Sequence, residues 1–206
     1  MALSQFIRWA RPIALLSGPL AIISVALVIA SEISSGGSVE AMEGSMTGML
    51  GGVLGLIGAI ALLIGLVAVY AYEYDRLTSL GVWGFIVALA GAAMSVGGLW
   101  SQVFVVPYLI AEAPQLLEQG AGPVMAGFIL SYALLGLGGL VFSIATLRGR
   151  AFPRWSSIVA IVGAVLCLAP LPSRYFLFAI AVTAWGAHIR PQETAGVRAG
   201  VAATAT

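Results

Sequence analysis

The sequence predicts an all-α membrane protein, a polytopic helical bundle of six transmembrane helices in a single domain. Two observations carry this prediction. The 206 residues are 61% hydrophobic and only 8% charged, whereas a soluble domain carries about 25% charged residues. Several apolar runs also reach the roughly 20 residues that a helix needs to cross a bilayer. A chain of this composition cannot cover a water-facing surface, so we expect its helices to face lipid.

The apolar runs predict the number of spans. Four runs are long enough to cross without interruption, namely 13–31, 49–71, 82–110 and 124–147. A fifth run is interrupted by Pro170 and Pro172, which remove helical hydrogen-bond donors. We expect two short spans there, 155–169 and 175–189, with a re-entrant pair as the alternative. Residues 1–190 then form one domain, and 191–206 form a flexible cytoplasmic tail.

The arginines predict the orientation. All nine basic residues are arginine, and with both termini inside, only Arg174 lies outside. Because inner loops carry the excess of basic residues, we expect both termini in the cytoplasm. The absence of lysine and the 26 glycines favour a bacterial cytoplasmic membrane. The alternative for the N-terminus is a signal peptide, since Arg8 and Arg11 precede an apolar run.

Part of the chain repeats itself. The stretch "WGFIVALAGA" at residue 83 recurs as "WSSIVAIVGA" at residue 155, 72 positions on, and "GLV" at 65–67 recurs at 139–141. The second and third spans therefore resemble the fourth and fifth. We interpret this as a duplicated helical hairpin.

Each copy contains a seam of small residues at alternating spacings of four and three. A 4-3 pattern keeps one stripe facing one neighbouring helix, and small residues allow close backbone approach in lipid. The predicted helix-packing seams are Gly84, Ala88, Gly91, Ser95 and Gly98 in the third span and Ser156, Ala160, Gly163 and Cys167 in the fifth. Leucine at either seam is expected to be disruptive.

Tryptophans mark the expected membrane–water interfaces. Belt anchoring is the default interpretation for Trp9, Trp83, Trp100, Trp155 and Trp185. Trp100 has a second interpretation, because Gln102 lies beside it and Pro107 follows. With Tyr132, these residues are the candidate lining of a pocket for a neutral or lipophilic ligand.

The sequence contains few residues that could catalyse a reaction or bind a metal ion. No charged residue lies in the central part of any span, so a proton relay or general acid–base site is not expected. The single histidine, His188, cannot build a zinc or haem site alone. A loose methionine–glycine pattern at Met42, Met46 and Met49 is too compact for copper transport. We therefore predict no enzyme activity, no metal and no cofactor.

Two further predictions concern charge. The formal net charge of +1 excludes the basic surface that nucleic-acid binding requires. In "YAYEYDR" at 70–76, Glu73 and Arg76 are expected to form a surface ion pair within a tyrosine girdle. Loss of one charged loop residue should then be nearly harmless.

Two stretches carry a resemblance to known proteins. The stretches "RGRAFPRWSSIVAIVGAVLCLAPLP" at 148–172 and "GLWSQVFVVP" at 98–107 resemble a broad group of bacterial multi-span membrane proteins with no established activity. The resemblance covers about the last two-thirds of the chain. It implies the helical membrane fold and no particular activity.

Two functions remain open at the level of sequence. The dense seams and missing reactive groups favour a small non-catalytic membrane protein, either an accessory or structural subunit of a larger complex or a homo-oligomer. The alternative is a membrane binding or transport component for a neutral or lipophilic small molecule. The lipid bilayer is a partner in both hypotheses.

Overall fold

The computed structural model describes residues 3–36, 45–113, 122–169 and 175–189, and every regular element within these ranges is a helix. The predicted all-α class is thus confirmed for the described residues. The predicted tail at 191–206 and the proline turn at 170–174 lie outside them.

Four helical segments are long and apolar enough to cross a membrane. They contain α1 (Leu3–Ser34), α3 (Met46–Glu73) with the short 3-10 helix η1 (Tyr74–Arg76), α4 (Ser79–Phe104) with α5 (Val106–Glu112), and α7 (Gly122–Gly149). The first four predicted spans fall on these segments. The helices run past the predicted ends because hydropathy marks only the apolar part of each helix. The predicted 82–110 span also has an interruption, since α4 ends before Val105 and α5 begins after it.

Two shorter apolar helices complete the bundle, α8 (Arg154–Cys167) and α9 (Phe176–His188). With 14 and 13 residues, they are about 21 Å and 20 Å long, whereas the hydrocarbon core is about 30 Å thick. The residue that follows α8, Leu168, lies against Gly136, where an added Cβ would be 2.7 Å from the leucine Cδ2. Because Gly136 lies near the middle of α7, α8 extends along only half of that helix. Six full spans are therefore not confirmed.

Local sequence explains where two of the long helices begin. Ser45 precedes α3 and accepts a hydrogen bond from the Gly48 N–H at 2.9 Å, and Thr78 precedes α4 and accepts from the Gly81 N–H at 3.4 Å. Each hydroxyl satisfies one of the backbone donors that the first helical turn leaves unpaired.

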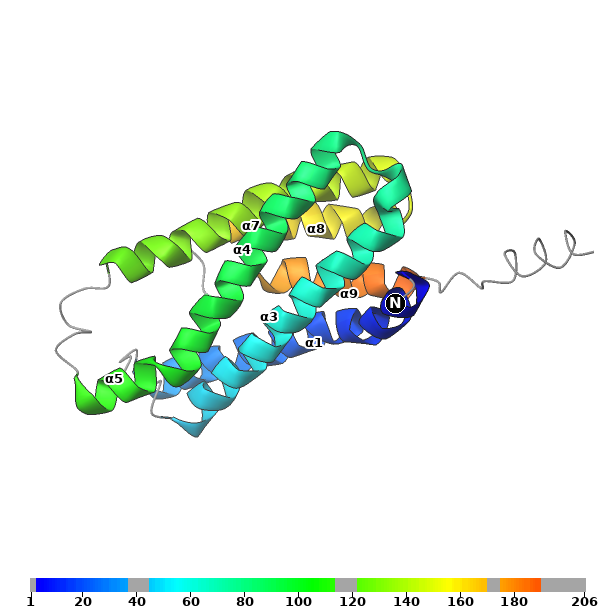
Figure 1. Ribbon diagram of the computed structural model, residues 1–206. Coiled ribbons are helices and arrows are strands. Elements are labelled where there is room, and N and C mark those ends of the chain that lie inside the picture. The colour runs from blue at the N-terminus through cyan, green and yellow to red at the C-terminus, as the bar shows by residue number, and fades with distance from the viewer. Residues whose placement is uncertain (1–2, 37–44, 114–121, 170–174, 190–206) are drawn as a thin grey trace, which may run out of the picture.

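The helices form one closed bundle (Figure 1). α1 packs against α3 and α9, α4 packs against α7, and α8 packs between α7 and α9. Close approach depends on glycine along α3, where Cβ atoms at Gly51, Gly58 and Gly65 would lie 3.1–3.2 Å from the nearest α1 atoms. The largest fully buried side chains are Trp185, Phe142 and Phe178. Their rings meet edge to face, with the centroid of Trp185 at 6.0 Å from Phe142 and 6.4 Å from Phe178.

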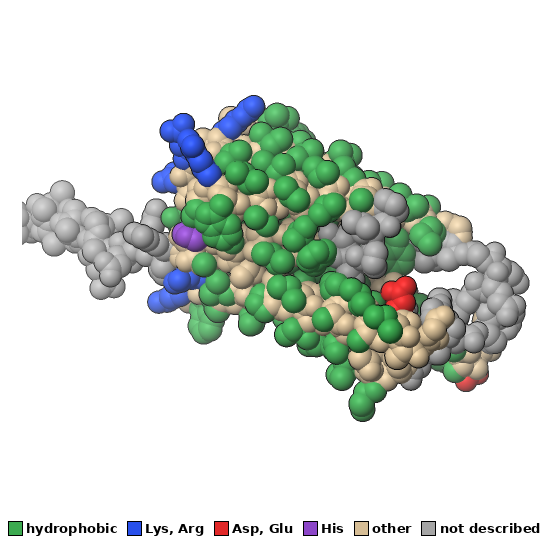
Figure 2. Space-filling model, turned by 180° about the vertical axis from the view of Figure 1, so that it is seen from behind, with side chains coloured by type: hydrophobic (Ala, Val, Ile, Leu, Met, Phe, Trp, Pro, Cys, Tyr) green, Lys and Arg blue, Asp and Glu red, His purple; other side chains and the backbone are tan. Residues whose placement is uncertain are grey.

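Basic residues gather at one end of the bundle. On the face shown in Figure 2, arginine side chains gather at one end and acidic side chains lie toward the other. The N-terminus, the α3–α4 turn and the α7–α8 turn meet at one end in Figure 1. We call this the arginine end, and it carries Arg8, Arg11, Arg76, Arg148, Arg150 and Arg154. Glu32 lies in the last turn of α1 and Glu112 is the last residue of α5, at the opposite end.

Candidate functional site

The predicted seam on α4 faces α7 of the same chain. A Cβ on Gly91 would overlap the backbone of Leu135, and one on Gly84 would lie 2.8 Å from the Phe142 nitrogen. A Cβ on Gly98 would lie 2.6 Å from the Phe128 ring. The backbone of Ala88 meets Gly138 in the same way, and Ser95 is buried with its hydroxyl donating to the Gly91 carbonyl at 2.9 Å. Gly84, Ala88, Gly91 and Gly98 therefore contact α7 directly. Ser95 is buried one turn after Gly91.

The predicted seam on α8 faces α9. A Cβ on Gly163 would lie 2.6 Å from the backbone nitrogen of Phe178. Ser156, Ala160 and Cys167 are fully buried on the same side, and the Ser156 hydroxyl donates to the Pro153 carbonyl at 2.7 Å. Both seams are therefore occupied by helices of this chain.

The predicted ligand-lining residues have different surroundings. Trp100 is 52% exposed and lies beside Phe104, with ring centroids 5.6 Å apart, and Gln102 is also exposed. Tyr132 on α7 is instead half-buried, packs against the core and interacts electrostatically with the Tyr175 phenol. Trp100 and Gln102 are therefore exposed, whereas Tyr132 packs against the core of the bundle.

A group of hydroxyls near Tyr132 was not predicted from sequence. The Tyr175 hydroxyl donates to the Gly55 carbonyl at 3.2 Å, and the Ser24 hydroxyl donates to the Gly51 carbonyl at 2.8 Å. Gly55 makes room for both, because its Cβ would lie 2.7 Å from the Ser24 oxygen and 3.4 Å from the Tyr175 oxygen. These hydrogen bonds join the start of α9 to α3 and join α1 to α3.

A second polar contact joins α1 to α9. The Thr183 hydroxyl accepts a hydrogen bond from the Gly18 N–H at 2.7 Å and donates to the Ala14 carbonyl at 3.2 Å. The Ser17 hydroxyl lies 3.1 Å from it and also reaches the Ala179 carbonyl at 3.1 Å. The polar side chains here hold helices together, which is their common use in lipid.

Glu73 corrects one prediction. Its side chain is only 1% exposed, so the expected surface ion pair with Arg76 is wrong. The Thr146 hydroxyl of α7 donates to Glu73 Oε2 at 2.7 Å, while Oε1 is buried without a hydrogen-bond partner. A carboxyl group at this position was missed because, in sequence, it lies among interfacial tyrosines at a helix end.

Trp185 corrects a second prediction. The side chain is fully buried, and its ring packs against Phe142, Phe152 and Phe178. Belt anchoring is therefore wrong for Trp185. The other four tryptophans are 52–65% exposed, as the belt interpretation requires.

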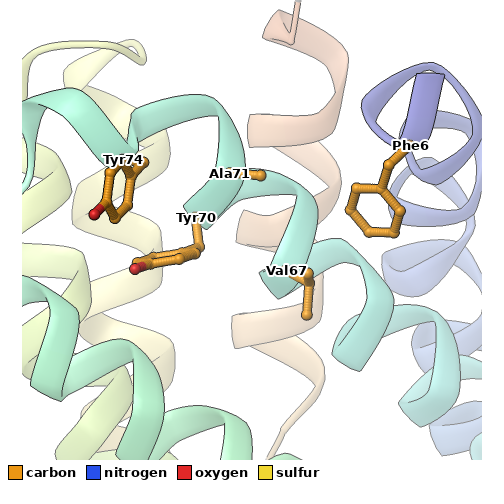
Figure 3. A pocket seen from close by; sticks show the side chains of 5 residues that line it. All are labelled: Phe6, Val67, Tyr70, Ala71 and Tyr74. Carbon is orange, nitrogen blue, oxygen red and sulfur yellow. The ribbon is translucent and has the colours of Figure 1, made fainter. Parts of the chain in front are cut away.

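A groove of about 370 Å³ crosses the outer surface of α3 near the arginine end. Its lining residues are Phe6 of α1 and Val67, Tyr70, Ala71 and Tyr74 along α3. Figure 3 shows Phe6 reaching toward α3, with Ala71 between it and the two tyrosines. The Tyr70 ring stacks on Phe85 of α4, with the ring centroids 4.0 Å apart. Carbon atoms alone form its accessible wall, which suits an apolar occupant.

Within the described ranges, no three His, Cys, Asp or Glu side chains are grouped closely enough to hold a metal ion. His188 is exposed, and its Nδ1 lies 2.8 Å from the Ala184 carbonyl. The groove on α3 is the candidate site of this chain.

Comparisons with protein-family models, with curated proteins and with solved structures find no match to this chain. The resemblance of residues 98–107 and 148–172 to bacterial multi-span proteins consequently stays a prediction.

Proposed function

We propose that this chain is a non-catalytic integral membrane protein that binds a lipophilic molecule taken from the bilayer. The observation that carries the proposal is the groove formed by Phe6, Val67, Tyr70, Ala71 and Tyr74. Its volume of about 370 Å³ lies within the range of small-molecule pockets, about 300–1,000 Å³. It opens sideways from a helix long enough to span a membrane, so molecules dissolved in the bilayer have direct access.

The competing proposal is an accessory subunit or a homo-oligomer. The predicted seams motivated it, because small residues at one face allow another helix to approach. In the structure Gly91 lies against α7 and Gly163 lies against α9. Neither seam is therefore exposed for contact with a partner chain. A subunit would have to associate through other surfaces. This difference favours the binding proposal over the subunit proposal.

The proposed setting is the bacterial cytoplasmic membrane, with both termini in the cytoplasm. The gathering of arginines at one end of the bundle supports this orientation, since cytoplasmic ends carry the excess of basic residues. The start of α1 and the last described residues of α9 lie at this arginine end.

We also propose a finer architecture. The hairpin α3–α4 and the hairpin α7–α8 are duplicates, and in each the second helix places its seam on a helix that follows it in the chain, α4 on α7 and α8 on α9. The contacts of Gly91 and Gly163 support this equivalence. Because α8 reaches only the middle of α7, a re-entrant α8–α9 pair is favoured over two full spans.

Native mass spectrometry tests the proposed function. The protein is released gently from its own membrane and its mass is compared with the 21.1 kDa of the chain. We expect one stoichiometric extra mass of small-molecule size that dissolves in organic solvent. A bare chain would contradict the binding proposal. An extra mass the size of a polypeptide would support the subunit proposal instead.

A further inference from the structure

We infer that the space between Glu73 and Gly149, at the arginine end of the bundle, binds one small monovalent metal cation such as Na⁺. This site lies between α3 and α7 and is independent of the groove on the outer surface of α3. Three observations support the inference, namely a buried carboxylate oxygen without a partner, a space beside that oxygen and the meeting of two helix ends.

The carboxyl group of Glu73 has a partner for only one of its two oxygens. Oε2 accepts a hydrogen bond from the Thr146 hydroxyl at 2.7 Å, whereas Oε1 is buried without a hydrogen-bond partner. None of the described arginine N–H groups therefore reaches Oε1, although Arg76 follows Glu73 by three residues. A buried carboxylate without a compensating positive charge is costly. A cation in contact with Oε1 would supply that charge.

The space beside Oε1 is lined by oxygen acceptors. A Cβ added to Gly149 would lie 3.9 Å from Glu73 Oε1 and 3.8 Å from the Arg76 carbonyl oxygen, and the closest atom that it meets, Arg76 Cβ, is 3.7 Å away. The side chain that glycine lacks thus leaves room for one small occupant beside two oxygens. Carboxylate and carbonyl oxygens are the ligands of hard cations. A single carboxylate balances a single positive charge, which favours a monovalent ion.

Two helix ends meet at this space. α7 ends at Gly149, and η1, which continues α3, ends at Arg76. The last carbonyl groups of a helix lack partners within it, and this end of a helix carries a partial negative charge that favours cations. The charged neighbours Asp75, Arg148 and Arg150 are exposed, so water and salt screen them. Gly149 is only half-buried, which leaves the space accessible from the water at the arginine end.

Carbodiimide labelling of the purified full chain tests this site. N,N′-dicyclohexylcarbodiimide modifies buried carboxyl groups, and a cation bound to Glu73 protects it from the reagent. The protein in an uncharged detergent is labelled at one pH and one ionic strength, either in sodium chloride or in N-methyl-D-glucamine chloride, whose cation is too large for the space. Peptide mass spectrometry locates and counts the label. Glu73→Gln shows which part of the labelling belongs to Glu73.

Two glycine variants form a matched pair. Gly149→Ala places a methyl group in the space at ordinary contact distances of 3.7–3.9 Å, so the fold is expected to be retained. Gly97→Ala adds the same methyl group to α4, where no atom lies within 4 Å. Circular dichroism of each variant checks that the helices are retained.

We expect Na⁺, at ten times its half-protecting concentration, to slow the labelling of Glu73 by about tenfold. Gly149→Ala should be labelled at the same rate in both salts, because its methyl group fills the space, and Gly97→Ala should behave as the wild type. Na⁺ should also raise the melting temperature of the wild type relative to N-methyl-D-glucamine, and should not raise that of Glu73→Gln.

Three results would overturn the inference. Equal labelling of the wild type in both salts would mean that Glu73 binds no Na⁺. Protection that persists in Gly149→Ala would mean that Na⁺ acts elsewhere on the protein. If Glu73 is labelled in neither salt, the melting temperature decides, and a wild type that does not respond to Na⁺ contradicts the site. Each of these results leaves the proposed binding of a lipophilic molecule unchanged, since that proposal depends on the groove.

Discussion

Individual glycines decide how closely the helices of this bundle approach. Gly91 and Gly97 lie on the same helix and differ only in the direction they face. An added Cβ at Gly91 would overlap the Leu135 backbone and lie 2.7 Å from the Ser131 carbonyl oxygen, whereas at Gly97 no atom lies within 4 Å. Backbone atoms cannot rotate away as a side chain can, so α4 and α7 would have to separate.

This contrast yields the first prediction. Gly91→Ala should destabilise the protein by about 1–3 kcal/mol, the usual cost of forcing an atom into a packed core. Gly97→Ala should be neutral or slightly stabilising, because alanine is the better helix former. Thermal unfolding in detergent measures both, and equal melting temperatures would show that the α4–α7 contact is not as close as described.

Glu73 carries the second prediction. Glu73→Gln should change stability by less than about 1 kcal/mol, because an amide oxygen still accepts the hydrogen bond from Thr146. Glu73→Ala should cost about 1–3 kcal/mol, since it leaves the buried Thr146 hydroxyl without this acceptor. Asp75→Asn, an exposed neighbour, is the control. If Glu73→Ala is as stable as the control, the hydrogen bond between Thr146 and Glu73 does not contribute to stability, and Glu73 behaves as the surface residue expected from sequence.

Sequence could not reveal the burial of Glu73 or Trp185. Both lie near helix ends, where tyrosine, tryptophan and charge normally mark the membrane interface. Their burial depends on which neighbours pack there. Thr146 follows Glu73 by 73 positions, and Phe142, Phe152 and Phe178 come from three different parts of the chain. A local sequence pattern cannot show contacts between residues that lie so far apart in the chain.

Among the helices, the α1–α9 pair shows how polar groups hold the bundle together. Thr183 bonds the Gly18 N–H and the Ala14 carbonyl, and Gly18 leaves the space that its hydroxyl needs, since a Cβ there would lie 2.7 Å from Thr183 Oγ1. Pro19 and Pro12 lie within α1, so this helix contains positions where backbone carbonyls lose their usual partner. The threonine and Ser17 supply partners in that region.

The third prediction follows from this pair. Thr183→Val keeps the shape of the side chain and removes its hydrogen bonds, so we expect a loss of about 1 kcal/mol, near the upper range of such bonds between membrane helices. Ser35→Ala, which removes an exposed hydroxyl at the end of α1, should have no effect. A Thr183→Val variant with unchanged stability would mean that packing alone joins α1 to α9.

The helices themselves were largely predictable. Hydropathy places the four long helices because each must match the bilayer thickness. The residues at the 4-3 spacing on α4 and α8 are mostly buried. The same spacing says nothing about which helix covers each face, so α7 and α9 could not be identified as the partners. The depth reached by α8 and α9 was also beyond prediction, because 15 apolar residues fit a short span and a re-entrant helix equally well.

At the scale of the molecule, the described residues form a charged end, a buried aromatic core and a lateral apolar groove. The groove was not predicted, although Tyr70 and Tyr74 were recognised as sharing a helix face. Its second wall, Phe6, lies in a segment placed before the first predicted span. Groove formation therefore depends on α1 beginning ten residues earlier than hydropathy indicates, at Leu3 instead of position 13.

The central claim is that the small-residue seams pack helices of the same chain against each other and do not form an interface between separate chains. The mass of the detergent-solubilised protein, determined by light scattering for wild type and Gly91→Leu, tests it most directly. We predict that the variant keeps the wild-type number of 21.1 kDa chains per particle and melts at a lower temperature. A wild-type oligomer that Gly91→Leu converts into equally stable single chains would contradict the claim and make the seam an interface between subunits.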